Sequence, residues 1–234
     1  MSRGAWTIAR INLKNLKIPY LITGTLTAVM LIRTAVTCIA VANGGSAGSA
    51  EISGGCYLWL LPVLAAVFTP AVNFRRFINI GGRRDNFLWG SLLSYVIIAG
   101  GVSLLNLLIY YTFDRFVTAA GFFKYGVINL INLYGWAQRG VFVSFIRQFV
   151  FLLLVAVAVH TLAAIQDRWY GVAVNLLLAA VFIFLPVERL AAVMLWGFSL
   201  LLYHPNVVLQ ITVSLLLTAL IYVINKPIFA RKVI

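Results

Sequence analysis

The feature that most constrains this chain is a series of apolar stretches close to 20 residues long, separated by short and mostly basic segments. A helix needs about 20 mainly apolar residues to cross the hydrocarbon core of a bilayer. Of the 234 residues, 63% are hydrophobic and only 10% are charged, and the mean hydropathy is +1.02. A water-soluble core of this size could not bury so much apolar surface. The sequence therefore predicts a single transmembrane domain over residues 1–234, an all-α polytopic helical bundle.

About six transmembrane helices are predicted from the apolar stretches. Glycine, proline and charged residues lie between the stretches, as is typical of the ends of membrane helices. In the second stretch, Pro62 and Pro70 predict a kink and an end, because proline lacks the N–H group that continues a helix. The predicted helices cover residues 18–42, 56–72, 88–112, 148–165, 171–186 and 206–225.

Three other segments are not predicted to be ordinary spans. Residues 1–17 predict a basic amphipathic helix at the membrane interface rather than a cleaved signal sequence, with Ile8 and Leu16 among its apolar contacts. Residues 113–147 mix charged and aromatic residues, and part of this outer segment fits an interfacial helix. Residues 187–205 predict a re-entrant or interfacial hairpin before the last helix, with a full seventh span as the alternative.

The distribution of basic residues predicts that both ends of the chain lie in the cytoplasm. Cytoplasmic loops of membrane proteins carry an excess of Lys and Arg. With the N-terminus inside, the inner segments hold 12 of the 18 basic residues and the outer segments hold 5. The net charge of +13 then fits loops that face an anionic lipid leaflet. We expect a multi-pass protein of the cell's inner (plasma) membrane, in contact with the lipid bilayer and with no nucleic-acid partner.

The sequence contains none of the common catalytic or nucleotide-binding motifs. There is no GxxxxGK[ST] loop for ATP, and no GxSxG, HExxH or CxxC. All five acidic residues fall at the ends of predicted spans or in loops, which disfavours a carrier driven by ions on its own. His160 and His204 lie in separate segments without a nearby acid. We expect no catalytic residue, no metal and no cofactor in this chain, which is not predicted to be an enzyme.

A few polar or reactive residues fall in or near the predicted spans. Arg33 has two interpretations, a contact with an anionic substrate or an inter-helix pair, and a side chain that extends to the outer headgroups. His160 is more often a neutral histidine bonded to a neighbouring helix than a substrate contact. Cys38 and Cys56 flank the Gly/Ser-rich residues 43–55, and two small apolar side chains are favoured over a disulfide.

The most informative segment is 73–87, NFRRFINIGGRRDNF. A basic loop on the inner side explains its arginines, but not the order of a helical pattern, a GG break and a basic run into the next span. Two consecutive glycines permit a sharp turn. We therefore expect a short helix along the membrane that couples the spans to a cytosolic partner. The expected coupling residues are Arg75, Arg76, Phe77, Gly81, Gly82, Arg83, Arg84 and Asp85.

This order of elements resembles the permease subunits of ABC transporters of the ABC-2 type. The resemblance rests on ARINLKNLKIPY before the first span, on FRRFINIGGRRDNFLWG between spans two and three, and on the hairpin-like region before the last span. The long basic segment 113–147 departs from the short outer loop of many such permeases. The resemblance implies a second permease subunit, in a homo- or heterodimer, and separate cytosolic ABC ATPase subunits that hold ATP and Mg²⁺.

The expected function is thus that of a permease subunit of an ATP-driven transporter, an exporter of a hydrophobic or amphipathic substrate such as a peptide, a lipid or a drug-like molecule. The apolar, aromatic composition favours such substrates over small ions. The alternative is a non-transporting membrane protein, such as a peptide-immunity or assembly factor.

Overall fold

The computed structural model describes residues 3–46, 48–79, 83–166, 169–184 and 188–230. The described chain is an all-α bundle, as expected, with one parallel pair of two-residue strands, β1 (Glu51–Ile52) and β2 (Val127–Ile128). The helical elements are α1 (Arg3–Asn15), α2 (Lys17–Ala42), η1 (Gly54–Trp59), α3 (Leu60–Phe68), η2 (Thr69–Asn73), α4 (Phe74–Asn79), α5 (Arg84–Ile109), η3 (Tyr110–Asp114), α6 (Arg115–Ala119), α7 (Leu130–Leu133), η4 (Trp136–Arg139), α8 (Val141–Ile165), α9 (Trp169–Phe184), α10 (Glu188–Phe198), η5 (Ser199–Tyr203) and α11 (Val207–Ala230).

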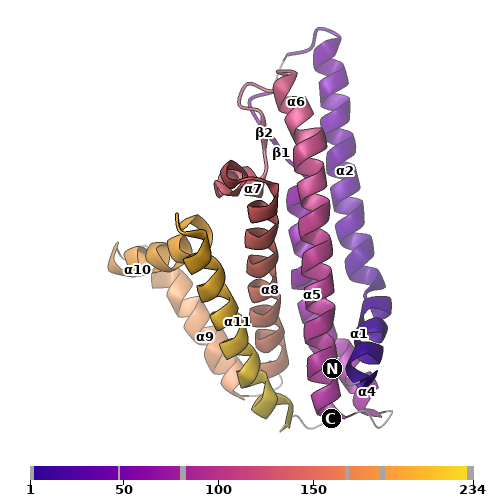
Figure 1. Cartoon of the computed structure of the whole chain (residues 1–234), viewed down its shortest axis with the longest axis vertical. Coiled ribbons are helices and arrows are strands. Elements are labelled where there is room, and N and C mark those ends of the chain that lie inside the picture. The colour runs from indigo at the N-terminus through magenta and orange to yellow at the C-terminus, as the bar shows by residue number, and fades with distance from the viewer. Residues whose placement is uncertain (1–2, 47, 80–82, 167–168, 185–187, 231–234) are drawn as a thin grey trace.

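The long helices run along one common direction, and the two ends of the bundle differ (Figure 1). One end holds α1, α4 and the last turns of α11, and we call it the termini end. The opposite end holds α6 and the β1–β2 pair, and we call it the sheet end. Two of the segments that the sequence assigned to the outer side, residues 43–55 and 113–147, thus contribute to the same end of the molecule.

Five helical stretches in the described residues are long and apolar enough to cross a membrane. They correspond to five of the six predicted spans. The sixth, predicted at 171–186, is α9, whose 16 residues make it a shorter apolar helix. The five stretches are Lys17–Ala42, Gly54–Asn79, Arg84–Ala119, Val141–Ile165 and Val207–Phe229.

The second stretch does not end at Pro70, so that prediction was wrong. A π-helical turn, η2, includes Pro70, and helical backbone continues through α4 to Asn79. A π turn widens the helix by one residue and so tolerates a proline that cannot donate the usual bond. The first part of the segment 73–87 is therefore the end of a long helix rather than a separate short helix.

The third and fourth helices are also longer than predicted. The third continues beyond residue 112 through a second π turn, η3, into α6, giving 36 residues in all. The fourth begins at Val141 rather than at residue 148. In both places the additional residues include charged side chains, Asp114 and Arg147, that are buried by contacts with other parts of the chain. Local hydropathy could not reveal those contacts.

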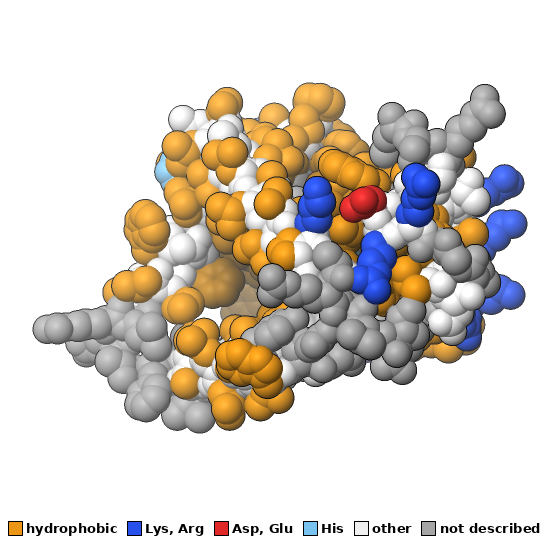
Figure 2. All heavy atoms as spheres, turned by 90° about the horizontal axis from the view of Figure 1, so that it is seen from below, with side chains coloured by type: hydrophobic (Ala, Val, Ile, Leu, Met, Phe, Trp, Pro, Cys, Tyr) orange, Lys and Arg blue, Asp and Glu red, His pale blue; other side chains and the backbone are white. Residues whose placement is uncertain are grey.

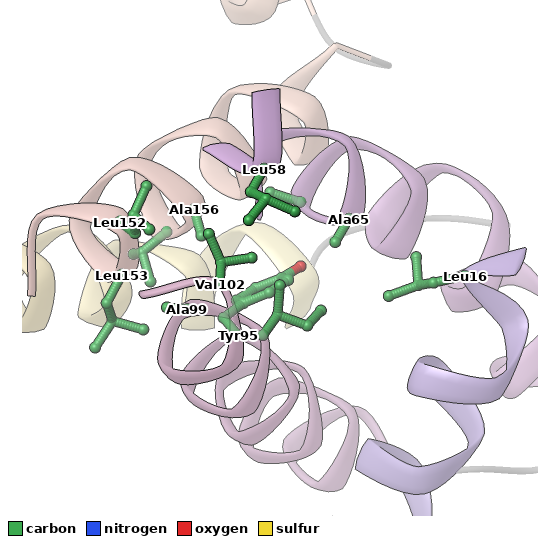
Figure 3. Packing of buried hydrophobic residues seen from close by; sticks show 12 residues of the cluster. Leu16, Leu58, Ala65, Tyr95, Ala99, Val102, Leu152, Leu153 and Ala156 are labelled. Carbon is green, nitrogen blue, oxygen red and sulfur yellow. The ribbon is translucent and has the colours of Figure 1, made fainter. Parts of the chain in front are cut away.

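The main core lies where α3, α5 and α8 meet (Figure 3). Small side chains from each helix, Ala65, Ala99 and Ala156, are fully buried there beside the ring of Tyr95. Small residues let helix backbones approach closely, which is how helices associate in membranes. The core is thus built as expected for a membrane bundle.

The N-terminal helix α1 packs against α5 rather than only against lipid. Ile8 of α1 and Leu16, which directly follows the helix, are buried in protein contacts. A Cβ atom at Gly90 of α5 would lie 2.6 Å from Ile8, so only glycine permits this approach. The helix itself agrees with the prediction for residues 1–17. Its position relative to a lipid surface stays a prediction.

Candidate functional site

Basic side chains gather on one side of the termini end. Figure 2 views this end directly and shows Lys and Arg side chains over that side, with an acidic side chain among them. Exposed basic residues in the elements of this end include Arg10 of α1, Arg76 of α4 and Arg83 just before α5. This arrangement brings the basic N-terminal helix and the segment 73–87 together, which makes the termini end the candidate site.

The predicted coupling residues have different surroundings. Arg76, Arg83 and Asp85 are exposed, whereas Arg84 and Phe77 are half-buried. Exposed arginines at the end of one long helix and the start of the next are free to meet a partner surface. The side chain of Arg75 and the whole of Gly81 and Gly82 lie outside the described residues, so the predicted turn is not described.

A cluster of four phenylalanines lies directly behind this basic surface. We call Phe74, Phe77, Phe87 and Phe229 the phenylalanine cluster. The ring centroids of Phe74 and Phe87 are 5.1 Å apart, and those of Phe74 and Phe229 are 4.8 Å apart, both edge to face. Phe87 and Phe229 are 5.7 Å apart. Such aromatic pairs contribute about 0.5–1.5 kcal/mol each beyond the burial of their area. The cluster therefore fixes α4 and the start of α5 to α11.

The contacts continue from the cluster into the middle of the bundle through His160 of α8. The imidazole ring stacks on Phe229 at 5.3 Å, and its Nδ1 forms a 2.6 Å hydrogen bond with the hydroxyl of Tyr95 on α5. His160 is fully buried. The expected bond to a neighbouring helix is thus present, and a role for His160 in a substrate path stays a prediction.

A chain of side-chain amides joins α1 to the same region. Asn73 donates to Asn12 Oδ1 at 3.1 Å, and Asn12 donates to the Ser91 hydroxyl at 3.4 Å. All three side chains are buried. A small cavity of about 150 Å³ beside them is lined in part by Arg76 and Phe77. The N-terminal helix is therefore bonded to the first part of the candidate coupling segment.

At the sheet end, a network of buried polar side chains surrounds Asn129, the N-cap of α7. Its Nδ2 donates to Asp114 Oδ2 at 2.9 Å and to the Ser53 hydroxyl at 3.0 Å, while its Oδ1 accepts from the backbone N–H of Ile131. Asn106, with its amide nitrogen toward Gly55, accepts from Gln148 and Trp59 in the same network. Polar groups without water must bond to one another, and this network joins η1, η3, α5, α7 and α8.

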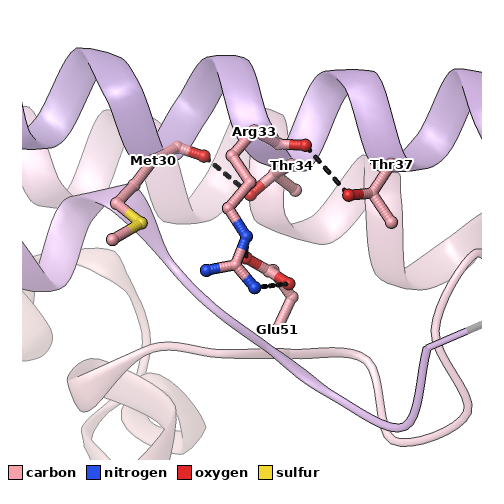
Figure 4. A network of polar contacts seen from close by, with 5 residues as sticks. All are labelled: Met30, Arg33, Thr34, Thr37 and Glu51. Carbon is pink, nitrogen blue, oxygen red and sulfur yellow. Dashed lines mark hydrogen bonds and ion pairs between the residues drawn. The ribbon is translucent and has the colours of Figure 1, made fainter.

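Arg33 forms an ion pair with Glu51 of β1 (Figure 4). The closest nitrogen and oxygen atoms are 3.5 Å apart, and the Arg33 side chain is 62% exposed while Glu51 is 7% exposed. Of the interpretations offered for Arg33, the structure shows a pair, between a helix and a strand. Any contact with a substrate stays a prediction.

Replacing Arg33 with glutamine is expected to destabilise the protein by about 1–3 kcal/mol, because Glu51 is 7% exposed and would lose its charged partner. We expect a decrease of that size in the free energy of unfolding, measured in detergent micelles. Arg33→Lys, which keeps the charge, is the control. A loss well above about 3 kcal/mol would show that the arginine has partners beyond Glu51.

Sequence reasoning missed the phenylalanine cluster and the sheet-end network. Nothing in the sequence indicates that Phe229 meets residues 74 and 87. Asn106 and Gln148 gave a weak signal, as amide side chains within the predicted spans 88–112 and 148–165. Both cysteines are free, as favoured.

No protein-family model, curated protein or solved structure matches this chain. Five apolar helices of spanning length support a membrane protein.

Proposed function

We propose that this chain is the permease subunit of an ATP-driven ABC transporter and exports a hydrophobic or amphipathic substrate. It pairs with a second permease subunit and with cytosolic ATPase subunits that hold ATP and Mg²⁺. The observation that carries this proposal is the phenylalanine cluster. It connects a basic surface at the termini end to α5 and α11, and through His160 to α8.

The proposed topology has six crossings, with both chain ends on the cytoplasmic side of the inner membrane. The fifth crossing is α9, which at 16 residues is about 24 Å long and needs local thinning of the bilayer. Figure 1 shows α10 lying crosswise to α9 and α11. This orientation supports the proposed interfacial hairpin before the last helix.

The proposed mechanism transmits ATPase movement through side-chain packing. When the ATPase subunits close, they displace the exposed arginines on either side of residues 80–82. Packed aromatic rings resist compression, so Phe74 and Phe87 move Phe229 and the end of α11 with them. Arg76 and Arg83 provide the charged contact, and the cluster behind them provides the rigid connection.

The double substitution Arg83→Glu plus Arg84→Glu tests the docking surface. Reversing charges in such a contact is expected to reduce co-purification of the ATPase subunit at least about tenfold and to abolish transport, with normal membrane insertion. The measurement is affinity purification with a co-expressed candidate ATPase, taken from the reading frame beside this one. The matched control, Arg115→Glu plus Lys124→Glu, makes the same charge change at the sheet end.

If the Arg83/Arg84 variant retains the ATPase subunit and transports normally, these arginines do not couple the chain to the ATPase. If the unaltered chain retains no ATPase subunit at all, the non-transporting alternative is favoured instead.

A further inference from the structure

A polar cavity of about 380 Å³ lies at the level of α7, where η4, α8 and the end of η5 meet. Its location is fixed by two long-range bonds. Trp136 Nε1 donates to the Leu202 carbonyl at 2.8 Å, and an Arg147 guanidinium nitrogen donates to the His204 carbonyl at 2.6 Å. The wall residues are Asn132, Leu133, Tyr134, Gly135, Gln138, Arg139, Arg147, Tyr203, His204 and Pro205.

Arg147 is the unusual member of this wall. Its side chain is only 4% exposed, yet its Nε has no hydrogen-bond partner. Guanidinium carries five N–H donors and stays charged in proteins. A buried charge without a counter-ion is strongly unfavourable. Arg147 donates to a neutral carbonyl, and among the described residues no carboxylate lies within ion-pair distance of it.

The rest of the wall adds positive charge and donors, not negative charge. Arg139 is exposed at the cavity, and the rings of Tyr134 and Tyr203 meet edge to face at 5.3 Å, with a hydroxyl on each. Among the described residues that line the cavity, none is Asp or Glu. In the part of the chain that the structure describes, the one ion pair within 4 Å is that of Arg33 with Glu51, on other elements. Two arginines thus face one polar cavity without a carboxylate.

We propose that this cavity binds a phosphate group, held by Arg147 and Arg139 with the tyrosine hydroxyls as further donors. Planar guanidinium groups match phosphate oxygens in pairs, and charge-assisted bonds of this kind are about twice as strong as neutral ones. The inference does not rest on the proposed transport function.

Two sources can supply such a phosphate, a phospholipid headgroup and a soluble phosphate ion. Tyr and Trp residues are enriched where membrane helices meet the headgroups, and Tyr134, Trp136 and Tyr203 lie at or beside this cavity. The source is decided by experiment, since the chemistry of the contact is the same for both.

The test uses the full chain purified in maltoside micelles, which contain no phosphate. Binding of inorganic phosphate and of dioctanoyl phosphatidylglycerol is measured by calorimetry at constant ionic strength, with dioctanoylglycerol as the phosphate-free lipid. We expect Arg139→Gln and Arg147→Gln each to weaken phosphate-dependent binding about tenfold or more. Arg115→Gln, an exposed arginine of α6 outside this cavity, should bind like the unaltered protein.

Arg139 is exposed, so its variant keeps the test valid even if Arg147→Gln fails to fold. If inorganic phosphate binds, and Arg139→Gln weakens that binding, the cavity is a site for the soluble ion. Binding of phosphatidylglycerol but not of phosphate or dioctanoylglycerol, with the same sensitivity, supports a headgroup site. The proposal is overturned if neither phosphate compound binds, if dioctanoylglycerol binds as well as phosphatidylglycerol, or if Arg139→Gln has no more effect than Arg115→Gln.

Discussion

Replacing Phe87 with alanine is expected to destabilise the protein by about 3–5 kcal/mol, the usual cost of removing a fully buried phenylalanine ring. Phe87 is 0% exposed and contacts Phe74, Phe77 and Phe229. Its loss leaves a cavity between α4, α5 and α11. Thermal unfolding in micelles, followed by tryptophan fluorescence, measures the change.

Two variants show whether the effect comes from the ring contacts. Phe116→Ala, on α6, removes a ring that is 67% exposed, and the unfolding free energy should change by no more than about 0.5 kcal/mol. Phe87→Leu keeps most of the volume and should recover most of the stability. Suppose that Phe87→Leu folds well and that its partner ATPase subunits still hydrolyse ATP. A loss of transport in that variant would then show that the phenylalanine cluster transmits movement. Full transport in that variant would contradict the proposed mechanism.

The second large effect is expected for Asn129→Ala at the sheet end. The substitution removes the donor to Asp114 and leaves a carboxylate that is 2% exposed without that partner. Losing a hydrogen bond to a buried charged group costs about 1.5–3 kcal/mol. The N-cap of α7 is lost at the same time, at about 1 kcal/mol. We expect the largest decrease in unfolding temperature among single polar substitutions.

The cause of that loss can be separated by a double substitution. Asp114→Asn removes the charge, so the combination with Asn129→Ala should be more stable than Asn129→Ala alone. Asn132→Ala, three residues away and exposed, is the matched control and should have little effect. Equal destabilisation by Asn129→Ala and Asn132→Ala would show that the network does not stabilise this end.

Hydropathy predicted most of the fold because lipid imposes a simple rule on sequence. Five of the predicted spans are helices of spanning length, since a helix satisfies the backbone hydrogen bonds of an apolar run within the run itself. The ends of the helices were harder. The charges of Asp114 and Arg147 suggested that these residues lie in loops. In the structure, Asp114 is bonded to Asn129 and Arg147 to His204, partners that are distant in sequence.

Only the exposed arginines of the candidate site could be predicted from the sequence. The arginines of the segment 73–87 marked a charged surface from the sequence alone. Its support by Phe229, from the end of the chain, depends on a tertiary contact for which no local pattern exists. The role of Arg33 was predicted in part. An ion pair was one of its interpretations, but the sequence did not identify Glu51 as the partner.

The continuous helix from α5 through η3 to α6 has the length that a lever would need. It begins at Arg84, beside residues 80–82, and its 36 residues extend about 54 Å to the sheet end. A tilt of roughly 5° at one end displaces the other by roughly 5 Å over that length. The π turn η3, near the far end, is where such a rod bends most easily. A small angular change beside the arginines therefore becomes a displacement about as large as a side chain at the opposite end of the molecule.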